Sequence, residues 1–264
     1  MSAGILVDVT RCTGCERCAV ACAESNQRDL VAAEADRATT RDGLSANRWC
    51  TVVEADEGRF ARKSCMHCLE PSCVSACLVG SLKKTPQGPV VYDPDKCIGC
   101  RYCMLACPFE VPRYEWAAVA PFMRKCDLCA DRLGRGERPA CVEACPHDVL
   151  VFGSREDLLG RAHALIRDNP GRYLPHVWGE TELGGTSVLY VSDVDLAALG
   201  WPGSDATAIP DITDPVIEKT PLLGGTVLAS IWGLSAIIQR RQRLMAAGAS
   251  SRVSDDGEEG GHRD

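Results

Sequence analysis

Sixteen of the seventeen cysteines in this chain fall into four groups of four, and each group has the spacing of iron–sulfur ligands. The first and third groups read C-x2-C-x2-C-x3-C, in which three thiolates hold one cluster and the fourth reaches a neighbouring one. Sixteen thiolates are the full ligand set of four [4Fe–4S] clusters, so the sequence predicts a protein that carries electrons. The groups are Cys12, Cys15, Cys18 and Cys22; Cys65, Cys68, Cys73 and Cys77; Cys97, Cys100, Cys103 and Cys107; and Cys126, Cys129, Cys141 and Cys145.

This spacing has a physical reason. Two residues between ligands let a short turn wrap one corner of a cluster, while backbone amides point at the sulfurs and offset their negative charge. In the first and third groups we expect the fourth cysteine to begin a helix that leads away, so that it faces a second cluster. We expect residues 5–22 and 92–110 to be equivalent units on this basis, each with a strand, a ligand loop and a helix start.

Two other uses of cysteine agree less well with the pattern. A zinc ribbon needs two C-x2-C pairs for each metal ion and has no use for the third and fourth cysteines of these groups. A disulfide framework is typical of short secreted chains, whereas this chain has 264 residues and 45% hydrophobic content. Iron–sulfur ligation is therefore the prediction.

Three residues near the ligands are expected to have other roles. Cys50 lies in an apolar, strand-like run and is expected to be a buried structural thiol. His67 and His147 lie inside or beside ligand loops, and we expect them to be surface residues or hydrogen-bonding residues rather than ligands.

The composition narrows the class of protein. The net charge of −7 argues against nucleic acid as a partner. Only 5% of the residues are aromatic, while Gly, Pro and Cys are frequent, so we expect loops and an interior filled largely by clusters. The metal-free chain should fold poorly, because metal binding and folding are coupled when ligands supply the core. No nucleophile–base set or nucleotide-binding glycine motif stands out, so we expect no catalysis by the chain alone.

The pattern of strands and helices predicts an α+β, loop-rich fold. The two central cysteine groups form one two-cluster unit, at about residues 60–110, and this unit is inserted into an outer unit that the first and fourth groups form. Residues 1–200 make up the four-cluster domain. Expected strands cover 5–9, 48–54, 90–93, 148–153 and 186–193, and expected helices cover 23–36 and 154–167, the latter with Ser154 as N-cap.

The C-terminal part has a different character. Residues 201–220 are rich in Pro, Asp and Thr and are expected to be a linker. Pro221 to Ile238 contains eighteen residues without a charge, and as a helix it would span about 27 Å, close to the thickness of a bilayer core. We predict a transmembrane helix at 221–239. A buried amphipathic helix is the alternative, but no polar stripe is wide enough to face water.

The flanking charges predict an orientation. Arg240, Arg241 and Arg243 follow the span, whereas acidic residues dominate before it. The positive-inside rule then places a disordered tail, 240–264, in the cytoplasm and the cluster domain on the periplasmic or outer face. No signal-like segment precedes Cys12. We therefore expect export together with a partner that carries the signal.

With four cysteine groups in this order, the chain resembles the iron–sulfur β subunits of membrane-bound respiratory oxidoreductases, of the formate dehydrogenase-N and hydrogenase-2 type. The resemblance covers nearly the whole chain. One departure is Leu78, where the family usually has proline, and we expect only a local change in that loop. The resemblance is carried by Cys12-Thr13-Gly14-Cys15, by residues 65–73, by Cys97-Ile98-Gly99-Cys100, by residues 125–129 and 139–146, and by Gly179-Glu180 with Gly184-Gly185-Thr186.

The resemblance implies two intertwined bacterial-ferredoxin-like units, each with two clusters, and a C-terminal transmembrane helix. It also implies that ligands cross between the cysteine groups, an assignment that the spacing alone leaves open for the fourth ligands. The implied sets are Cys12, Cys15, Cys18 and Cys145 for cluster 1; Cys65, Cys68, Cys73 and Cys107 for cluster 2; Cys77, Cys97, Cys100 and Cys103 for cluster 3; and Cys22, Cys126, Cys129 and Cys141 for cluster 4.

The implied function is electron relay by a non-catalytic subunit. Electrons would pass from a catalytic molybdenum, tungsten or nickel–iron subunit to a membrane cytochrome b or another quinone-reactive subunit. A freestanding soluble polyferredoxin is the alternative, and the uncharged C-terminal segment argues against it. A cluster-based enzyme would need an open iron position, yet the cysteines supply every ligand.

Overall fold

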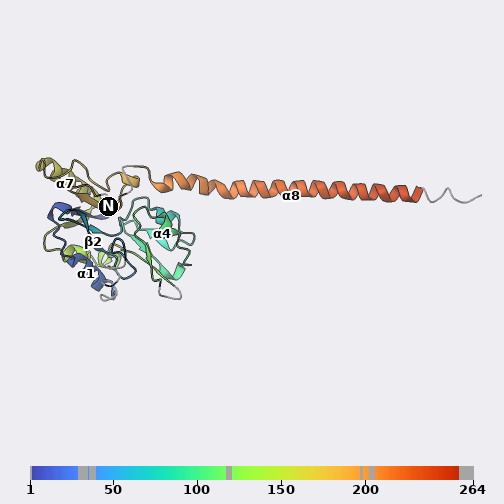
Figure 1. The fold of residues 1–264 in the computed structure, drawn as a ribbon. Helices are drawn as coiled ribbons and strands as arrows, with labels where there is room; N and C mark the ends of the chain where they lie inside the picture. The colour runs from blue at the N-terminus through green and yellow to red at the C-terminus, as the bar shows by residue number, and fades with distance from the viewer. Residues whose placement is uncertain are drawn as a thin grey trace, which may run out of the picture. The chain divides into compact units, whose positions relative to one another are not determined.

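The computed structural model describes residues 2–28, 35, 40–116, 121–196, 199–201 and 206–255. The chain divides into two compact units, Met1–Ile212 and Thr213–Asp264. The predicted fold class is confirmed, because short helices and strands alternate with long loops and an apolar helix ends the chain (Figure 1).

A three-stranded sheet forms the centre of the first unit. Its strands are β1 (Ala3–Asp8), β8 (Leu150–Ser154) and β9 (Val188–Val191), in the order β8-β1-β9. The middle strand, β1, pairs antiparallel with β8 and parallel with β9. Residues Gly4 to Asp8 are buried, as is expected for a strand that is covered on both faces. The sheet therefore joins the N-terminal segment to two segments far along the chain.

The two faces of β1 pack against different parts of the molecule. Ile5 and Val7 lie in the main core together with side chains of the cysteine loops, including Cys65, Cys126 and Cys141. Leu6, on the opposite face, packs against helix α7 (Arg155–Asp168). One face of the sheet therefore packs against the cysteine loops.

Helix α7 confirms the predicted start signal. The backbone N–H of Asp157 donates to the Ser154 hydroxyl at 3.2 Å, and that hydroxyl lies 2.6 Å from the Asp157 carboxylate. Ser154 therefore satisfies an N–H group that has no partner within the helix. Leu158 and Ala162 are the buried residues of the helix and face the sheet.

Three antiparallel hairpins carry or flank the cysteine loops. They pair β2 (Thr51–Asp56) with β3 (Arg59–Lys63), β4 (Leu82–Lys84) with β5 (Val90–Tyr92), and β6 (Arg113–Tyr114) with β7 (Met123–Arg124). The remaining short elements are η1 (Val9–Arg11), α1 (Arg17–Ser25), α3 (Ser72–Ser75), η2 (Pro94–Lys96), α4 (Tyr102–Ala106), α5 (Ala130–Gly134), α6 (Ala140–Glu143) and η3 (Glu182–Gly184).

Two elements of the first unit begin or end three residues or more from the predicted position. Strand β2 begins at Thr51 rather than at 48, because Ser45 and Arg48 close a turn in which each residue's backbone N–H bonds to the other residue. Helix α1 ends at Ser25, short of the helix expected over 23–36. Residues 29–34 and 36 of that expected helix lie outside the described residues.

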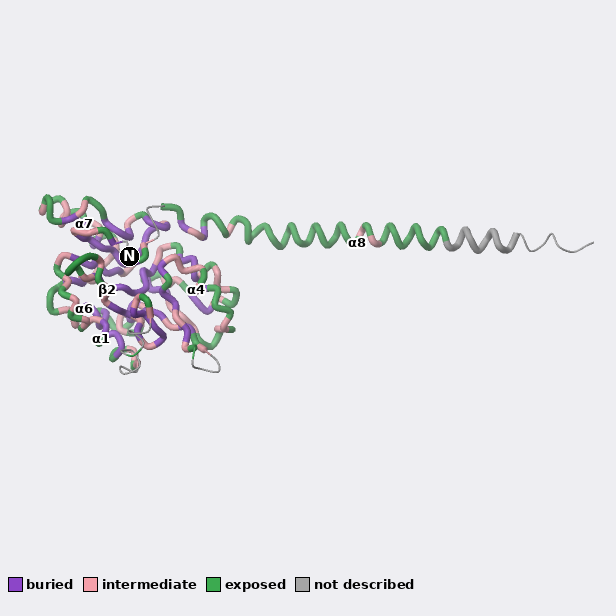
Figure 2. Tube along the Cα trace, viewed as in Figure 1, coloured by how far each residue is buried: buried purple, intermediate pink, exposed green. Residues whose placement is uncertain are grey.

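Helix α8 (Ile209–Asp255) contains the predicted span. It begins within the expected linker, so residues 209–220 are helical although they include Pro210 and Pro215, and Pro221 follows directly. The part Ile209–Met245 is long and apolar enough to cross a membrane. Figure 2 shows its residues mostly exposed, and Trp232 is 78% exposed. Residues 240–255 of the tail that was expected to be disordered belong to α8, and residues 256–264 lie outside the described residues.

Candidate iron–sulfur cluster sites

Four small cavities lie among the cysteine loops, and each is lined by four of the cysteines. Every cavity takes its cysteines from two of the sequence groups. Among the described residues, Cys50 is the cysteine outside these cavities. Cavity 1 is lined by Cys12, Cys15, Cys18 and Cys145; cavity 2 by Cys65, Cys68, Cys73 and Cys107; cavity 3 by Cys77, Cys97, Cys100 and Cys103; and cavity 4 by Cys22, Cys126, Cys129 and Cys141.

Helix α1 explains how one cysteine group lines two cavities. Cys18 and Cys22 are four residues apart on this helix, so they lie on one face about 6 Å apart along its axis. Cys18 lines cavity 1 and Cys22 lines cavity 4. The expectation that the fourth cysteine begins the helix is wrong, since the helix begins at Arg17. The backbone changes direction one residue before the helix, at Glu16, which is the N-cap and has a left-handed conformation with φ 59°.

The first and third cysteine groups have the same local conformation. Gly14 and Gly99 both have positive φ, at 75° and 71°, in the middle of their first C-x2-C turn. Glu16 and Arg101 are both left-handed and both precede a helix, α1 or α4. The prediction that these segments are equivalent units is confirmed.

The second and fourth groups repeat a different local structure. Pro71 and Pro139 stand at the N-cap of the short helices α3 and α6, which carry Cys73 and Cys141. Proline suits a helix start because the first N–H groups have no helical partner there. Helix α3 packs against α4, and α6 packs against α1. The pair α3 and α4 therefore brings the second cysteine group next to the third, and the pair α1 and α6 brings the first next to the fourth.

Backbone amides point at the cysteine sulfurs. The N–H of Ser81 donates to Cys77 Sγ at 3.2 Å, and the N–H of Leu128 donates to Cys126 Sγ at 3.4 Å. Such bonds stabilise sulfur in its negatively charged form. The loops thus provide the hydrogen bonds that thiolate ligands of a metal centre require.

Without metal, the buried cysteines hold their protons firmly. Burial raises the pKa of Cys73 to about 12 and the pKa of Cys107 to about 11, with neighbouring thiols adding to the effect. Burial likewise raises the pKa of Cys22 and Cys126 well above the ordinary value. Because metal ligands must be thiolates, loading of these cavities releases protons.

The donor set of each cavity fits a cluster. Four cysteines line each cavity, and four cysteine thiolates are the ligand set of a [4Fe–4S] cluster. Within the described part of the chain, no three His, Cys, Asp or Glu side chains lie close enough together to hold a single metal ion.

The two histidines differ in their surroundings. His67 is fully buried, and its Nδ1 accepts a hydrogen bond from the N–H of Val90 at 2.9 Å. It is therefore a hydrogen-bonding residue and not a surface residue. His147 is exposed at the edge of cavity 1.

Two buried basic residues beside the cavities were not predicted. Arg62 is 2% exposed and lines both cavity 1 and cavity 4. Lys125 is 5% exposed and lines cavity 2, and its ammonium donates to the carbonyls of Val90 and Cys126. Both precede a cysteine by three residues or fewer, and this short spacing was the one sign in the sequence that they lie near a cavity. The spacing did not indicate that they are buried.

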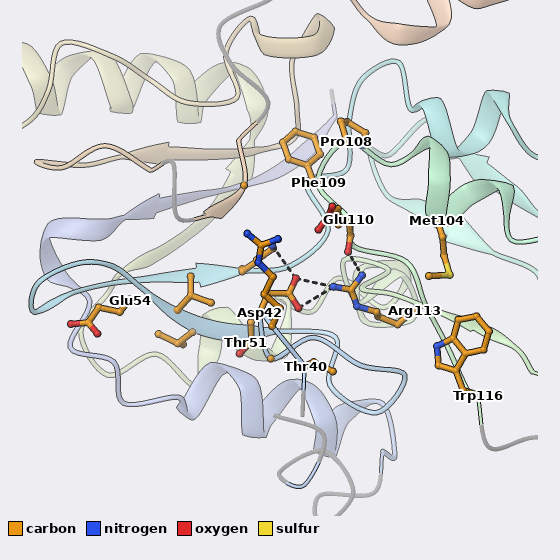
Figure 3. Close-up of a pocket in the computed structure, with 16 residues that line it drawn as sticks. Thr40, Asp42, Thr51, Glu54, Met104, Pro108, Phe109, Glu110, Arg113 and Trp116 are labelled. Atoms are coloured by element: carbon orange, nitrogen blue, oxygen red, sulfur yellow. Dashed lines mark hydrogen bonds and ion pairs between the residues drawn. The ribbon is translucent and has the colours of Figure 1, made fainter. Parts of the chain in front are cut away.

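An ion-pair network beside a surface groove ties the loops together (Figure 3). The carboxylate of Asp42 lies 3.0 Å from the Lys63 ammonium and 2.8 Å from the Arg113 guanidinium. Burial opposes ionisation of Asp42, but hydrogen bonds and charges from Lys63 and Arg113 prevail and hold its pKa below the ordinary value. The network links the end of β3 to strand β6 and so connects the loops of different cysteine groups.

Comparison with known proteins defines the class first: residues 57–155 match the family described as 4Fe-4S dicluster domain, so this is an iron–sulfur protein. The hydrogenase-2 operon protein HybA of Escherichia coli O157:H7 is 33% identical over 283 residues, covering 92% of this chain and 85% of that protein. The formate dehydrogenase iron–sulfur subunit of Haemophilus influenzae is 36% identical over 251 residues, covering 86% and 78%. A protein of Nitratidesulfovibrio vulgaris is 41% identical over 255 residues, covering 93% and 69%.

These likenesses extend over most of both chains. The chain belongs to the family of [4Fe–4S] iron–sulfur subunits that includes the hydrogenase-2 and formate dehydrogenase proteins, as the resemblance in the cysteine groups indicated.

Proposed function

We propose that each of the four cavities holds one [4Fe–4S] cluster, with the four cysteines that line it as ligands. The observation that carries this proposal is the partition of sixteen cysteines into four cavities, four to each. Cavities 2 and 3 then belong to an inner unit at about residues 60–110, and cavities 1 and 4 belong to an outer unit. The packing of α3 on α4 and of α1 on α6 supports this division.

When bound, such clusters accept and release one electron at a time. The residues of this chain hold them in fixed positions, donate amide hydrogen bonds to the sulfurs and keep water away. The cysteine side chains that line cavities 2 and 4 are mostly buried, which supports the exclusion of water there. We infer that the chain relays electrons and performs no catalysis of its own.

The partners follow from the relatives. A catalytic subunit with molybdenum, tungsten or nickel–iron oxidises a small reductant and releases two electrons per molecule. This chain passes them singly to a membrane cytochrome b or another quinone-reactive subunit, where a quinone takes up two electrons and two protons. The names of the relatives, which refer to hydrogenase-2 and formate dehydrogenase, support a catalytic subunit as the partner.

The C-terminal helix is the proposed anchor. An apolar helix with exposed Leu222, Leu223 and Trp232 suits a lipid environment better than water. The arginines after residue 239 favour a cytoplasmic C-terminus, which places the cluster unit on the outer face. Export then depends on a partner that carries a signal.

Anaerobic detergent extraction of the native protein, followed by iron analysis and mass spectrometry of the co-purifying chains, tests the relay function. We expect about sixteen irons per chain, from four clusters of four irons, together with a large metal-containing subunit and a membrane subunit. A chain that purifies alone without detergent would point to a soluble polyferredoxin instead.

Removal of residues 213–264 tests the anchor separately. In a strain that lacks the partners, the truncated protein should leave the membrane fraction with its iron content unchanged, because the cysteines all lie in the first unit. Continued sedimentation with membranes would contradict an anchor in α8.

A further inference from the structure

Arg62 occupies a place that no other basic residue in the described part of the chain shares. Its side chain lines both cavity 1 and cavity 4, so it stands between the two ligand sets of the outer unit. It is 2% exposed and comes from the middle of strand β3. A guanidinium remains protonated in proteins, so a full positive charge lies at this point.

The backbone of Arg62 is firmly held. Arg62 pairs with Val52 in the β2–β3 hairpin, and its carbonyl accepts a hydrogen bond from the Tyr190 hydroxyl at 2.7 Å. Tyr190 belongs to β9 and is itself buried. The side chain therefore starts from a fixed point that the central sheet defines.

The charge of Arg62 has no carboxylate to balance it. Among the described residues, no Asp or Glu forms an ion pair with it, and its Nε and Nη1 have no hydrogen-bond partner. Its Nη2 is 3.7 Å from Cys141 Sγ, a ligand position of cavity 4. The groups whose ionised forms would act on it most strongly are three cysteines, Cys50, Cys141 and Cys126.

Lys125 provides an instructive contrast. It is also buried and also lines a cavity, but its ammonium donates to two backbone carbonyls, those of Val90 and Cys126. A buried charge is costly unless it is paired and hydrogen-bonded. Lys125 therefore has hydrogen-bond acceptors within the protein. Arg62 has two nitrogens, Nε and Nη1, without a hydrogen-bond partner, and its Nη2 lies near the sulfur of Cys141.

We propose that Arg62 is the shared counter-cation of the two outer clusters, donating hydrogen bonds through its free nitrogens to the sulfur-bearing groups in cavities 1 and 4. The inference rests on the proposed function, since it requires clusters in both cavities. Reduction adds negative charge to the contents of a cavity, and a fixed positive charge in a dry interior favours that change. Arg62 therefore raises the reduction potentials of both outer clusters together.

The test measures cluster potentials in the full-length protein, extracted anaerobically in detergent, by redox titration with EPR detection. Signals are assigned beforehand with serine variants of one ligand per cavity. The variants are Arg62→Gln, which removes the charge, and Arg62→Lys, which keeps it. Arg59→Gln is the matched control, because Arg59 lies on the same strand but is 45% exposed and paired with Asp193.

In Arg62→Gln, we expect the reduced-to-oxidised ratio at a given potential to fall at least tenfold for the clusters of cavities 1 and 4. This corresponds to a shift of about −59 mV for one electron. The clusters of cavities 2 and 3 should keep their potentials, Arg62→Lys should shift cavities 1 and 4 less, and Arg59→Gln should shift none. Outer clusters in Arg62→Gln with the potentials of the Arg59→Gln protein would overturn the proposal.

Failure of cluster loading is also informative. If Arg62→Gln loses about half of its iron, from cavities 1 and 4, and Arg62→Lys restores it, the counter-cation role is supported. Equal loss from all four cavities, or an Arg62→Lys protein as defective as Arg62→Gln, would overturn it. A wild-type protein without four clusters would instead refute the proposed function, so the two failures are distinguishable.

Discussion

Replacement of Cys22 by serine tests whether one cysteine group serves two clusters. Cys22 lies on α1, one turn after Cys18, and lines cavity 4 with cysteines of the fourth group. Serine and cysteine have nearly equal helix propensities, and Asn26 still bonds to the carbonyl of residue 22, so α1 should persist. A serine hydroxyl is a poor substitute for a thiolate on iron. The expected result is loss of one cluster of four, about a quarter of the iron.

The measurement is iron and sulfide content with EPR of the reduced protein, purified anaerobically. Cys50→Ser is the matched control, since Cys50 is buried beside Cys22 but lines none of the four described cavities. Both substitutions replace a buried thiol with a hydroxyl, so any general damage should be similar in the two variants. Full iron in Cys50→Ser with a selective loss in Cys22→Ser supports cross-ligation. Loss of the cavity 1 signal alone in Cys22→Ser would refute it.

Three further substitutions probe the loops that carry the cysteines. In Gly14→Ala, the new Cβ would meet the Phe60 ring at 2.9 Å, whereas in Gly99→Ala nothing lies within 4 Å. Both variants should lose about 1–2 kcal/mol from their positive φ, and Gly14→Ala about 1–3 kcal/mol more from overpacking. Unfolding in urea, monitored by cluster absorbance, gives a midpoint for each variant. Equal midpoints for Gly14→Ala and Gly99→Ala would contradict this expectation. Asp42→Asn should lose about 2 kcal/mol near neutral pH, and the variant should lack the wild-type loss of stability in acid.

The sign of the Asp42 effect follows from its lowered pKa. A carboxylate whose pKa is lower in the folded state contributes stability above its unfolded pKa, about 3.9. That contribution disappears as the pH falls through the folded pKa. The wild-type and Asp42→Asn proteins should therefore converge in stability on acidification, and curves that stay parallel would show that the ion-pair network does not titrate.

The cysteines that line the cavities could be predicted from the sequence because their spacing reflects local geometry. A turn between two such cysteines is decided within three or four residues, and such turns are visible as Gly14 and Gly99. The Ser154 cap was predictable for the same reason, since a cap is a contact three residues long. That the first and fourth cysteine groups share two cavities depends on how α1 packs against α6, which local spacing does not encode.

The environment of the basic residues lay beyond sequence reasoning. Ala61, Arg62 and Lys63 are consecutive residues of β3, a strand that the sequence analysis did not predict, and all three are buried. Their burial results from the loops that fold over β3 from positions far along the chain. The early start of α8, at Ile209, was also missed, because Pro215 and the acidic residues near it are typical of a linker.

Buried thiols and a buried cation together make the fold depend on what the cavities hold. Without a cluster, the cysteines of cavity 4 keep their protons and Arg62 lacks an anionic partner, so its burial is unfavourable. With a thiolate-ligated cluster in cavity 4, the negative charge of the thiolates would compensate the positive charge of Arg62. Arg62 should therefore disfavour the metal-free fold and favour the loaded one. Such a residue makes a partly assembled outer unit unstable, so that cavities 1 and 4 should load together rather than one at a time.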